Sequence, residues 1–183
     1  MKIVIGVTGA SGIIYGVRLL EKLKEEKYLI VSENAKKIME YETKYKLDNL
    51  KKLAEHYYEN NDLFPEISSG SFMFDAMVIV PCSMSTLSKI ANGIGDNLVT
   101  RTAAVCLKEK RKLILVPRET PVSTIHLQNM AKLSENNVII LPAMPGFYPK
   151  PENLDDIVNF IAGKIMDCLG IKNTLYKRWG KHE

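Results

Sequence analysis

Five short apolar segments recur along the chain, separated by helical patterns, and this alternation constrains the fold more than any other feature. The segments are residues 2–7, 28–32, 75–81, 112–117 and 138–141, and each is a nearly continuous run of apolar, often branched residues. Strands that are buried on both faces of a parallel sheet have this composition. The sequence therefore predicts a doubly wound α/β fold with a mostly parallel sheet, formed by residues 1–183 as a single domain.

The intervening segments carry helical apolar spacing, and their positions indicate where a ligand site belongs. We expect helices at residues 12–25, 35–43, 47–58, 85–91, 97–110, 122–134 and 154–169. In open sheets of alternating strands and helices, ligands bind beyond the carboxyl ends of the strands. The residues that directly follow each predicted strand are therefore the candidates for function.

The stretch GVTGASGIIYG at residues 6–16 follows the first predicted strand and opens the first predicted helix. Its glycines are spaced Gly6-x-x-Gly9-x-x-Gly12, which departs from the dinucleotide fingerprint because Thr8 stands where that motif has glycine. It is not a Walker loop, since no Gly-Lys-Ser/Thr follows. A turn of this kind presents hydroxyls and backbone amides to a phosphate. The alternative is a tight strand-to-helix corner in which Ser11 is only the N-cap.

The later strands are followed by residues of similar character. Hydroxyl-rich turns come after the second and third predicted strands, and Arg118 stands beside Glu119 after the fourth. Hydroxyls and helix N-termini that converge on one edge of a sheet form a donor-rich pocket suited to a phosphorylated cofactor.

Charge, cysteine and histidine content exclude several other classes of function. A net charge of +4, with a basic run at residues 108–112 that lacks interleaved aromatics, disfavours nucleic acid. The longest apolar stretch is far shorter than the roughly 18 residues of a membrane helix, and no signal peptide is evident, so we expect a cytoplasmic protein without a membrane partner. Widely spaced cysteines and histidines predict buried thiols and no metal site; these residues are Cys82, Cys106, Cys168, His56, His126 and His182.

Several motifs together carry a resemblance to a known family. They are Gly9-Ala10-Ser11-Gly12, Pro81-Cys82-Ser83-x-x-Thr86-Leu87, Asp96-Asn97-Leu98-x-x-Arg101, Leu107-Lys108-Glu109, Arg118-Glu119-x-Pro121, His126-Leu127 and Pro145-x-Phe147-Tyr148-x-x-Pro151. In combination they resemble the flavin prenyltransferase family (UbiX type), and the likeness extends over residues 2–179.

The resemblance implies a flavodoxin-like, Rossmann-like three-layer fold and a homo-oligomer, commonly a dodecamer, with active sites at subunit contacts. The implied reaction joins the dimethylallyl group of dimethylallyl phosphate to N5 and C6 of reduced FMN, without a metal. The implied product, prenylated FMN, serves a partner decarboxylase.

Site residues follow from the resemblance position by position. The implied flavin-binding residues are Gly9, Ala10, Ser11, Ser32, Ser83, Met84, Ser85, Thr86, Arg101 and Arg118. The implied donor-phosphate group is Lys108, Arg118, Tyr148 and Lys164, where Lys164 replaces the arginine usual in the family. The implied catalytic set is Lys108, Arg118, Glu42 and Glu119, of which the two glutamates handle protons. The alternative for each glutamate is an ordinary surface or ion-pair role.

Two rival functions share these sequence features. A flavoprotein that oxidatively decarboxylates cysteinyl substrates has a Pro-x-Met-Asn segment, whereas this chain has Pro142-Ala143-Met144-Pro145, which removes the asparagine amide. A flavin carrier without catalysis has no need for the donor-phosphate group. Direct decarboxylation of an aromatic acid, the older interpretation of the family, ranks below both.

Overall fold

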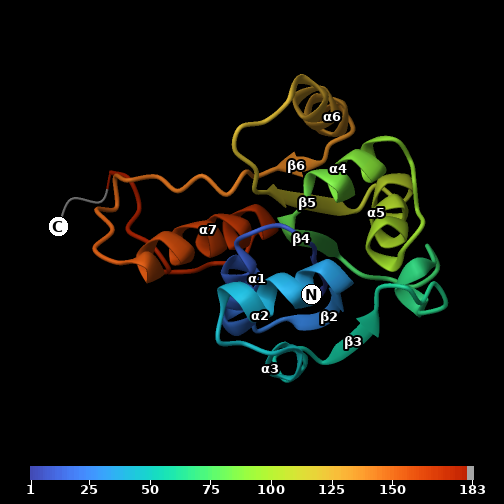
Figure 1. The fold of residues 1–183 in the computed structure, drawn as a ribbon, viewed down its shortest axis with the longest axis horizontal. Coiled ribbons are helices and arrows are strands. Elements are labelled where there is room, and N and C mark those ends of the chain that lie inside the picture. Colours follow the sequence, from blue (N-terminus) through green and yellow to red (C-terminus); the bar gives the residue numbers. More distant parts are fainter. Residues whose placement is uncertain (181–183) are drawn as a thin grey trace.

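The computed structural model describes residues 1–180, so His182 lies outside the described residues. Figure 1 shows one twisted sheet with helices on both of its faces. All six strands are parallel, in the order β3-β2-β1-β4-β5-β6. The elements are β1 (Lys2–Val7), α1 (Ile13–Lys22), β2 (Glu26–Val31), α2 (Glu33–Glu42), α3 (Leu47–Lys51), β3 (His56–Glu59), η1 (Glu66–Ser68), β4 (Ala76–Cys82), α4 (Met84–Ala91), α5 (Leu98–Lys108), β5 (Lys112–Pro117), α6 (Thr124–Glu135), β6 (Ile139–Ile140) and α7 (Leu154–Leu169).

Two hydrophobic cores, one on each face of the sheet, make the fold a three-layer sandwich. Successive strand residues point to opposite faces, so Ile3 and Ile5 of β1 pack with α1, α2, α3 and α7, while Val4 packs with α4, α5 and α6. All three side chains are fully buried. The predicted doubly wound α/β fold is confirmed.

The strand β3 adds to the five strands that the sequence predicts. The sequence prediction was wrong here, because it placed these residues at the end of a helix over 47–58. The helix α3 ends at Lys51, and His56–Glu59 pairs instead with β2, in the register Tyr28↔His56. The rings of Tyr28 and His56 stack with centroids 4.3 Å apart. Aromatic residues favour strands when they can pack across a neighbouring strand, and this pairing overrides the helical pattern.

The sheet changes direction of winding between β1 and β4, and the turns after these two strands are joined by Thr8. Its side chain is almost fully buried. The Thr8 hydroxyl donates to the carbonyl oxygen of Pro81 at 2.9 Å and accepts from the backbone amide of Ser83 at 2.8 Å. Thr8 therefore fixes the two turns at the switch point, the place where ligands bind in such sheets.

No helix within residues 1–180 combines the length and apolar character needed to cross a membrane.

Candidate functional site

The glycine turn after β1 needs its glycines for two separate reasons. Gly12 has a φ of 102°, a left-handed conformation that other residues rarely adopt. At Gly9 the chain passes so close to the start of α2 that an added Cβ would lie 2.6 Å from the Cβ of Asn34. The turn is thus held tightly between β1, α1 and α2.

A carboxylate, not a serine, occupies the N-terminus of α1. The Glu42 Oε2 atom, at the end of α2, accepts from the Gly12 amide at 2.9 Å and from the Ile13 amide at 3.4 Å. The N-cap residue itself is Gly12, which has no side chain to accept from these amides. The alternative reading of Ser11 as an ordinary N-cap is therefore wrong, and the exposed Ser11 side chain faces solvent beside the turn.

Beside this turn lies a polar hollow of about 310 Å³ at the carboxyl edge of the sheet. Three helices begin at its wall with side-chain caps: Ser32 caps α2, Ser83 caps α4 and Asn97 caps α5. Helix N-termini carry partial positive charge and free amides, which suit an anion. The lining residues are Thr8, Gly9, Ser32, Glu33, Asn34, Asn60, Ser83, Ser85, Thr86, Lys89, Asn97 and Val99.

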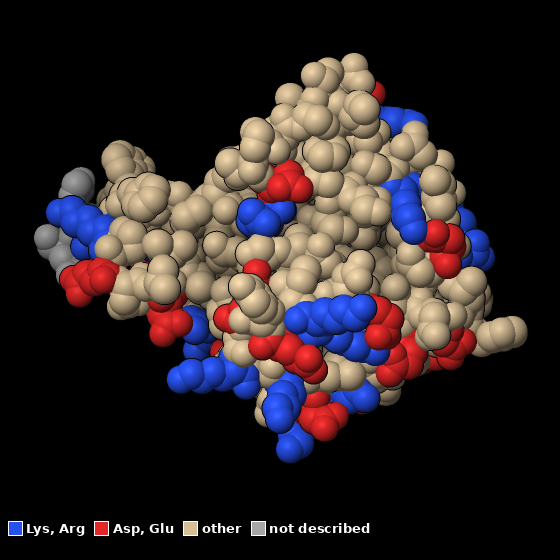
Figure 2. All heavy atoms as spheres, viewed as in Figure 1, with Lys and Arg blue, Asp and Glu red and all other residues tan. Residues whose placement is uncertain are grey.

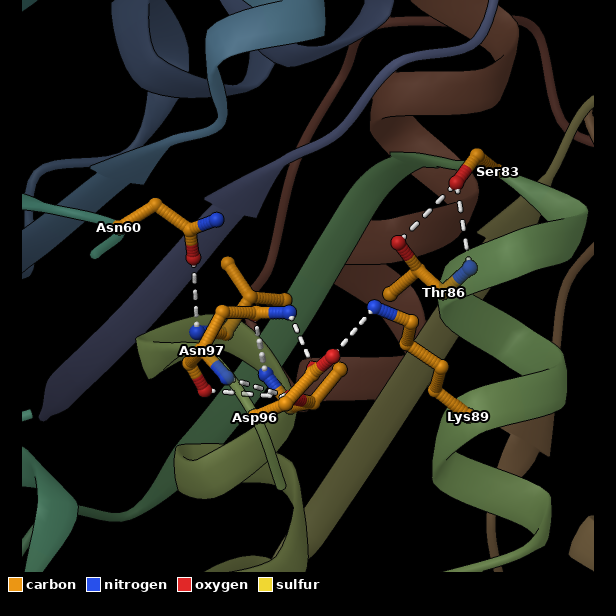
Figure 3. A network of polar contacts seen from close by, with 8 residues as sticks. Asn60, Ser83, Thr86, Lys89, Asp96 and Asn97 are labelled. Carbon is orange, nitrogen blue, oxygen red and sulfur yellow. Dashed lines mark hydrogen bonds and ion pairs between the residues drawn. The ribbon is translucent and has the colours of Figure 1, made fainter. Parts of the chain in front are cut away.

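A chain of polar contacts organises the far wall of the polar hollow (Figure 3). The Ser83 hydroxyl donates to Thr86 Oγ1 at 3.0 Å, and Lys89 Nζ lies 2.6 Å from Asp96 Oδ2. The Asn60 side-chain oxygen accepts from the Val99 amide at 3.1 Å, at the start of α5. Of these contacts, the Lys89–Asp96 pair joins the last turn of α4 to the start of α5.

A second, apolar hollow of about 180 Å³ lies between the ends of β4 and β5 and the helix α6. Met84, which follows Ser83, lines it, so one turn after β4 serves both hollows. Figure 2 shows this face of the molecule hollowed between the α6 region and the α7 region, with charged side chains gathered mainly below, over α2 and α3. The lining residues are Met84, Pro117, Arg118, Glu119, Thr120, Val122, Leu127, Met130, Pro142, Ala143 and Met144.

Arg118 connects the apolar hollow to the glycine turn. Its Nε donates to the carbonyl oxygen of Ser11 at 3.2 Å. Tyr15 and Arg118 both lie beside Gly12. Burial raises the pKa of the Tyr15 phenol, and the Arg118 guanidinium acts in the opposite direction. A cation therefore stands between the apolar hollow and the glycine turn, next to exposed Glu119.

Tyr148 and Lys164 belong to the C-terminal part of the chain, and neither lines the polar or the apolar hollow. The ring of Tyr148 packs edge-on against Phe160 of α7, with centroids 5.8 Å apart, and against Trp179 at 5.5 Å. Lys164 follows Phe160 by four residues, so the two share one face of α7. Both Tyr148 and Lys164 keep part of their surface exposed.

Two predicted site residues lie elsewhere within the chain. Arg101 and Lys108 are exposed and two turns apart on α5, so they share one face of that helix. Arg101 donates to the carbonyl oxygen of Ser68, and Lys108 pairs with Glu109. Because α5 leads into the start of β5 while Arg118 follows its end, the length of that strand, roughly 20 Å, separates Lys108 from Arg118.

Several residues that line the polar hollow were not among the predicted flavin-binding residues, and they include Asn34, Asn60 and Lys89. Asn34 follows Ser32 after the second predicted strand, where a search for site residues could have included it. No sequence signal links the segment of Asn60 with α5, which it contacts in the fold. Lys89 stands at a position of its helix where a lysine is usually an ordinary surface residue.

Among residues 1–180, no three or more His, Cys, Asp or Glu side chains gather in a way that could hold a metal ion.

Comparisons with known proteins agree with this geometry. The Flavoprotein family profile matches residues 1–166. A flavin prenyltransferase UbiX from Thermoplasma acidophilum is 57% identical over 180 residues, which cover 98% of this chain and all of that protein.

Two solved structures share the fold over almost the full chain. AnUbiX (PadA1) in complex with FMN and dimethylallyl pyrophosphate has a TM-score of 0.96 at 39% identity, covering all of this chain and 98% of its own. A dodecameric FMN-dependent UbiX-like decarboxylase from Escherichia coli O157:H7 has a TM-score of 0.96 at 45% identity, covering 99% of this chain and all of its own.

Proposed function

The chain belongs to the flavoprotein family and, within it, to the flavin prenyltransferases of the UbiX type, and on this premise we propose that its site joins a dimethylallyl group to N5 and C6 of reduced FMN. The observation that carries the proposal is the pair of hollows, polar and apolar, that share the turn after β4, with Arg118 of the apolar hollow bound to the glycine turn. A molecule with a polar phosphate tail and an apolar ring system fits such a pair. The whole chain, residues 1–183, acts as one domain in this proposal.

Each hollow takes one part of FMN. The polar hollow receives the phosphate and sugar alcohol, with Ser32 and the segment 83–86 as donors and with Gly9, Ala10 and the exposed Ser11 hydroxyl along the glycine turn. The apolar hollow receives the ring edge and the prenyl chain, where Met84 and Met130 exclude water. The reduced flavin supplies the nucleophilic atoms.

The donor phosphate is held by fixed cations and a phenol. Breaking the allylic C–O bond develops negative charge on the leaving phosphate, which positioned donors stabilise most effectively. Arg118, Tyr148 and Lys164 supply such donors from one chain. We assign the transfer to these groups without a metal.

Lys108 and Arg101 complete the site from a neighbouring copy. They are exposed on one face of α5, Lys108 lies about the length of β5 from Arg118 of the same chain, and a symmetric assembly can bring that face to another subunit's hollow. One solved relative is a dodecamer, an assembly in which the same contacts between copies repeat. The proposal therefore includes a homo-oligomer with shared active sites.

Two glutamates handle the proton that leaves C6 when the new ring closes. Glu119 lies at the edge of the apolar hollow next to Arg118, and Glu42 contacts the first amides of α1 beside the glycine turn. A carboxylate within reach of the flavin can accept the proton.

The product passes to a decarboxylase that uses prenylated FMN. We place this exchange in the cytoplasm, because Cys82, Cys106 and Cys168 are all free thiols, the state that a reducing compartment maintains.

The rival functions have less support from this site. The cysteinyl decarboxylase signature needs an asparagine where Pro145 stands. A carrier has no use for the two cations and the phenol of Arg118, Tyr148 and Lys164.

The test is anaerobic incubation of the protein with reduced FMN and dimethylallyl phosphate, or the pyrophosphate in a parallel sample, in the presence of a chelator. We expect the extracted flavin to gain one five-carbon unit by mass spectrometry. Unmodified flavin from a folded, FMN-loaded protein would contradict the proposal and favour the carrier.

A further inference from the structure

The polar hollow has one basic side chain in its wall, and nothing in the family resemblance assigns it a role. Of the residues in the described chain that line this hollow, Lys89 is the sole lysine or arginine. It lies in α4, four residues after Ser85, so both side chains stand on the same side of the helix. Helical side chains lean toward the N-terminus of their helix, which directs Lys89 toward the capped turn at Ser83.

Lys89 is held by a single carboxylate. Its Nζ lies 2.6 Å from Asp96 Oδ2, and the two side chains are 35% and 50% exposed (Figure 3). Asp96 is itself fixed, because its Oδ1 accepts from the side-chain amide of Asn97 at 2.9 Å. The hydrogen bond from Lys89 lowers the pKa of the Asp96 carboxyl below its ordinary value, so this carboxyl is ionised at neutral pH.

The other charged groups near this wall are already paired with one another. Glu33, which also lines the hollow, accepts from Lys36 at 2.6 Å, and Lys36 binds Glu59 at 2.7 Å. Lys89 is therefore the cation placed to meet an anion that enters the polar hollow.

We propose that Lys89 turns from Asp96 to the phosphate of FMN, and that this contact makes the site select FMN over riboflavin. The inference rests on the proposed function, since it takes FMN as the ligand. A phosphate monoester carries about −1.5 to −2 charges at neutral pH, more than the single charge of Asp96. Riboflavin has no phosphate, so with riboflavin bound Lys89 stays on Asp96.

The experiment titrates flavin-free protein with oxidised FMN and, separately, with riboflavin, and follows the quenching of flavin fluorescence. The variants are Lys89→Gln and, as a matched control for the loss of one positive charge, Lys37→Gln, an exposed lysine of α2. We expect Lys89→Gln to raise the Kd for FMN about 5- to 20-fold. The effect is smaller than for a buried charge-assisted hydrogen bond, because the Lys89 side chain is partly exposed. The Kd for riboflavin changes by less than about twofold, and Lys37→Gln leaves both values as in the wild type.

A second variant separates phosphate binding from a merely structural ion pair. Asp96→Asn keeps the contact with Asn97 but frees Lys89 and removes a negative charge near the phosphate. We expect it to leave FMN binding unchanged or tighter, the opposite direction from Lys89→Gln. If the pair only holds α4 and α5 together, both variants weaken both flavins alike, and the proposal is overturned.

The outcome for this inference is distinguishable from that for the proposed function, because the titration needs no prenyl transfer. Wild-type protein that prenylates FMN while Lys89→Gln keeps the wild-type ratio of FMN to riboflavin affinity would overturn only the role of Lys89. Wild-type protein that binds neither flavin would overturn the proposed function itself.

Discussion

Lys164 is the residue at which this chain departs from the arginine that its family usually has. A lysine supplies a point charge to a phosphate, whereas arginine supplies two aligned donors. If Lys164 binds the donor phosphate, we expect Lys164→Ala to raise the KM for dimethylallyl phosphate about 10- to 100-fold. This factor corresponds to the free energy of one charge-assisted hydrogen bond, which the variant loses. FMN affinity stays near the wild-type value.

Steady-state kinetics at saturating reduced FMN measure this effect. Lys164→Arg should retain activity close to the wild type, and Lys22→Ala, an exposed lysine at the end of α1, is the matched control. An unchanged KM and kcat in Lys164→Ala would remove Lys164 from the donor site.

Glu42 has a structural contact that can be separated from its proposed proton-handling role. Its carboxylate accepts from the Gly12 and Ile13 amides at the start of α1. Glu42→Gln keeps an acceptor there and loses only the charge near the helix N-terminus, so we expect a loss of about 0.5 kcal/mol in the free energy of unfolding. If Glu42 also moves a proton, kcat falls by about 100-fold in the same variant.

Urea unfolding and prenyl-transfer rates, measured side by side, distinguish the two roles. Glu40→Gln, exposed on the same helix, is the control. A Glu42→Gln enzyme with wild-type kcat would limit Glu42 to capping α1.

At the scale of elements, the segment after α7 is fastened through one carboxylate. Asp167 accepts two hydrogen bonds from Arg178, at 2.7 and 2.8 Å, and one from the Tyr176 phenol at 2.5 Å. This docking carries Trp179, the single tryptophan of the chain, to the ring of Tyr148. The fluorescence of Trp179 therefore reports whether the segment stays docked.

Burial acts to raise the pKa of Asp167, but the hydrogen bonds from Arg178 and Tyr176 outweigh it and hold the pKa below its ordinary value. A carboxyl with a lowered folded-state pKa stabilises the docked form above its unfolded pKa, near 4, and loses that effect as the pH falls through the folded value. We expect Trp179 anisotropy to be constant from about pH 5 to pH 8 and to fall below about pH 4. Asp167→Asn should lower it at every pH, with docking weakened by about 1 kcal/mol.

Glu135→Gln, an exposed change at the end of α6, is the control for this experiment. Equal anisotropy in Asp167→Asn and the wild type at pH 7 would show that other contacts hold the segment.

Most elements were predictable because their residues share one local signal. The buried strands β1, β4 and β5 are continuous apolar runs, and α7, predicted at residues 154–169, has the bounds Leu154–Leu169. The strand β3 was not predictable, because its pairing with β2 depends on rings stacked across strands that are 28 residues apart in sequence. The cap of α1 by Glu42 is likewise a contact between distant segments.

At the scale of the whole molecule, the position of Lys108 suggests an active site shared between subunits. The sequence places Lys108 in the donor group through family resemblance, but one folded chain separates it from Arg118 by the length of β5. Which residues a neighbouring copy supplies depends on assembly, which no local sequence pattern encodes.

Mixing two impaired variants tests this sharing. Lys108→Ala and Lys164→Ala, dissociated together and reassembled at equal amounts, should form hetero-oligomers in which about a quarter of the sites contain both lysines. We expect prenyl-transfer activity to rise well above that of either variant alone. Variants mixed without reassembly are the control, and no recovery in fully exchanged oligomers would place both lysines in one chain's site.

The central claim, that this chain transfers a prenyl group to flavin, is tested most directly by the stoichiometry of a single anaerobic turnover. Enzyme in excess of reduced FMN receives dimethylallyl phosphate, and both inorganic phosphate and prenylated flavin are quantified in the quenched sample. The account predicts that the two products appear in equal amounts and at the same rate. Phosphate release without a modified flavin, or neither product from protein that holds FMN, would contradict it.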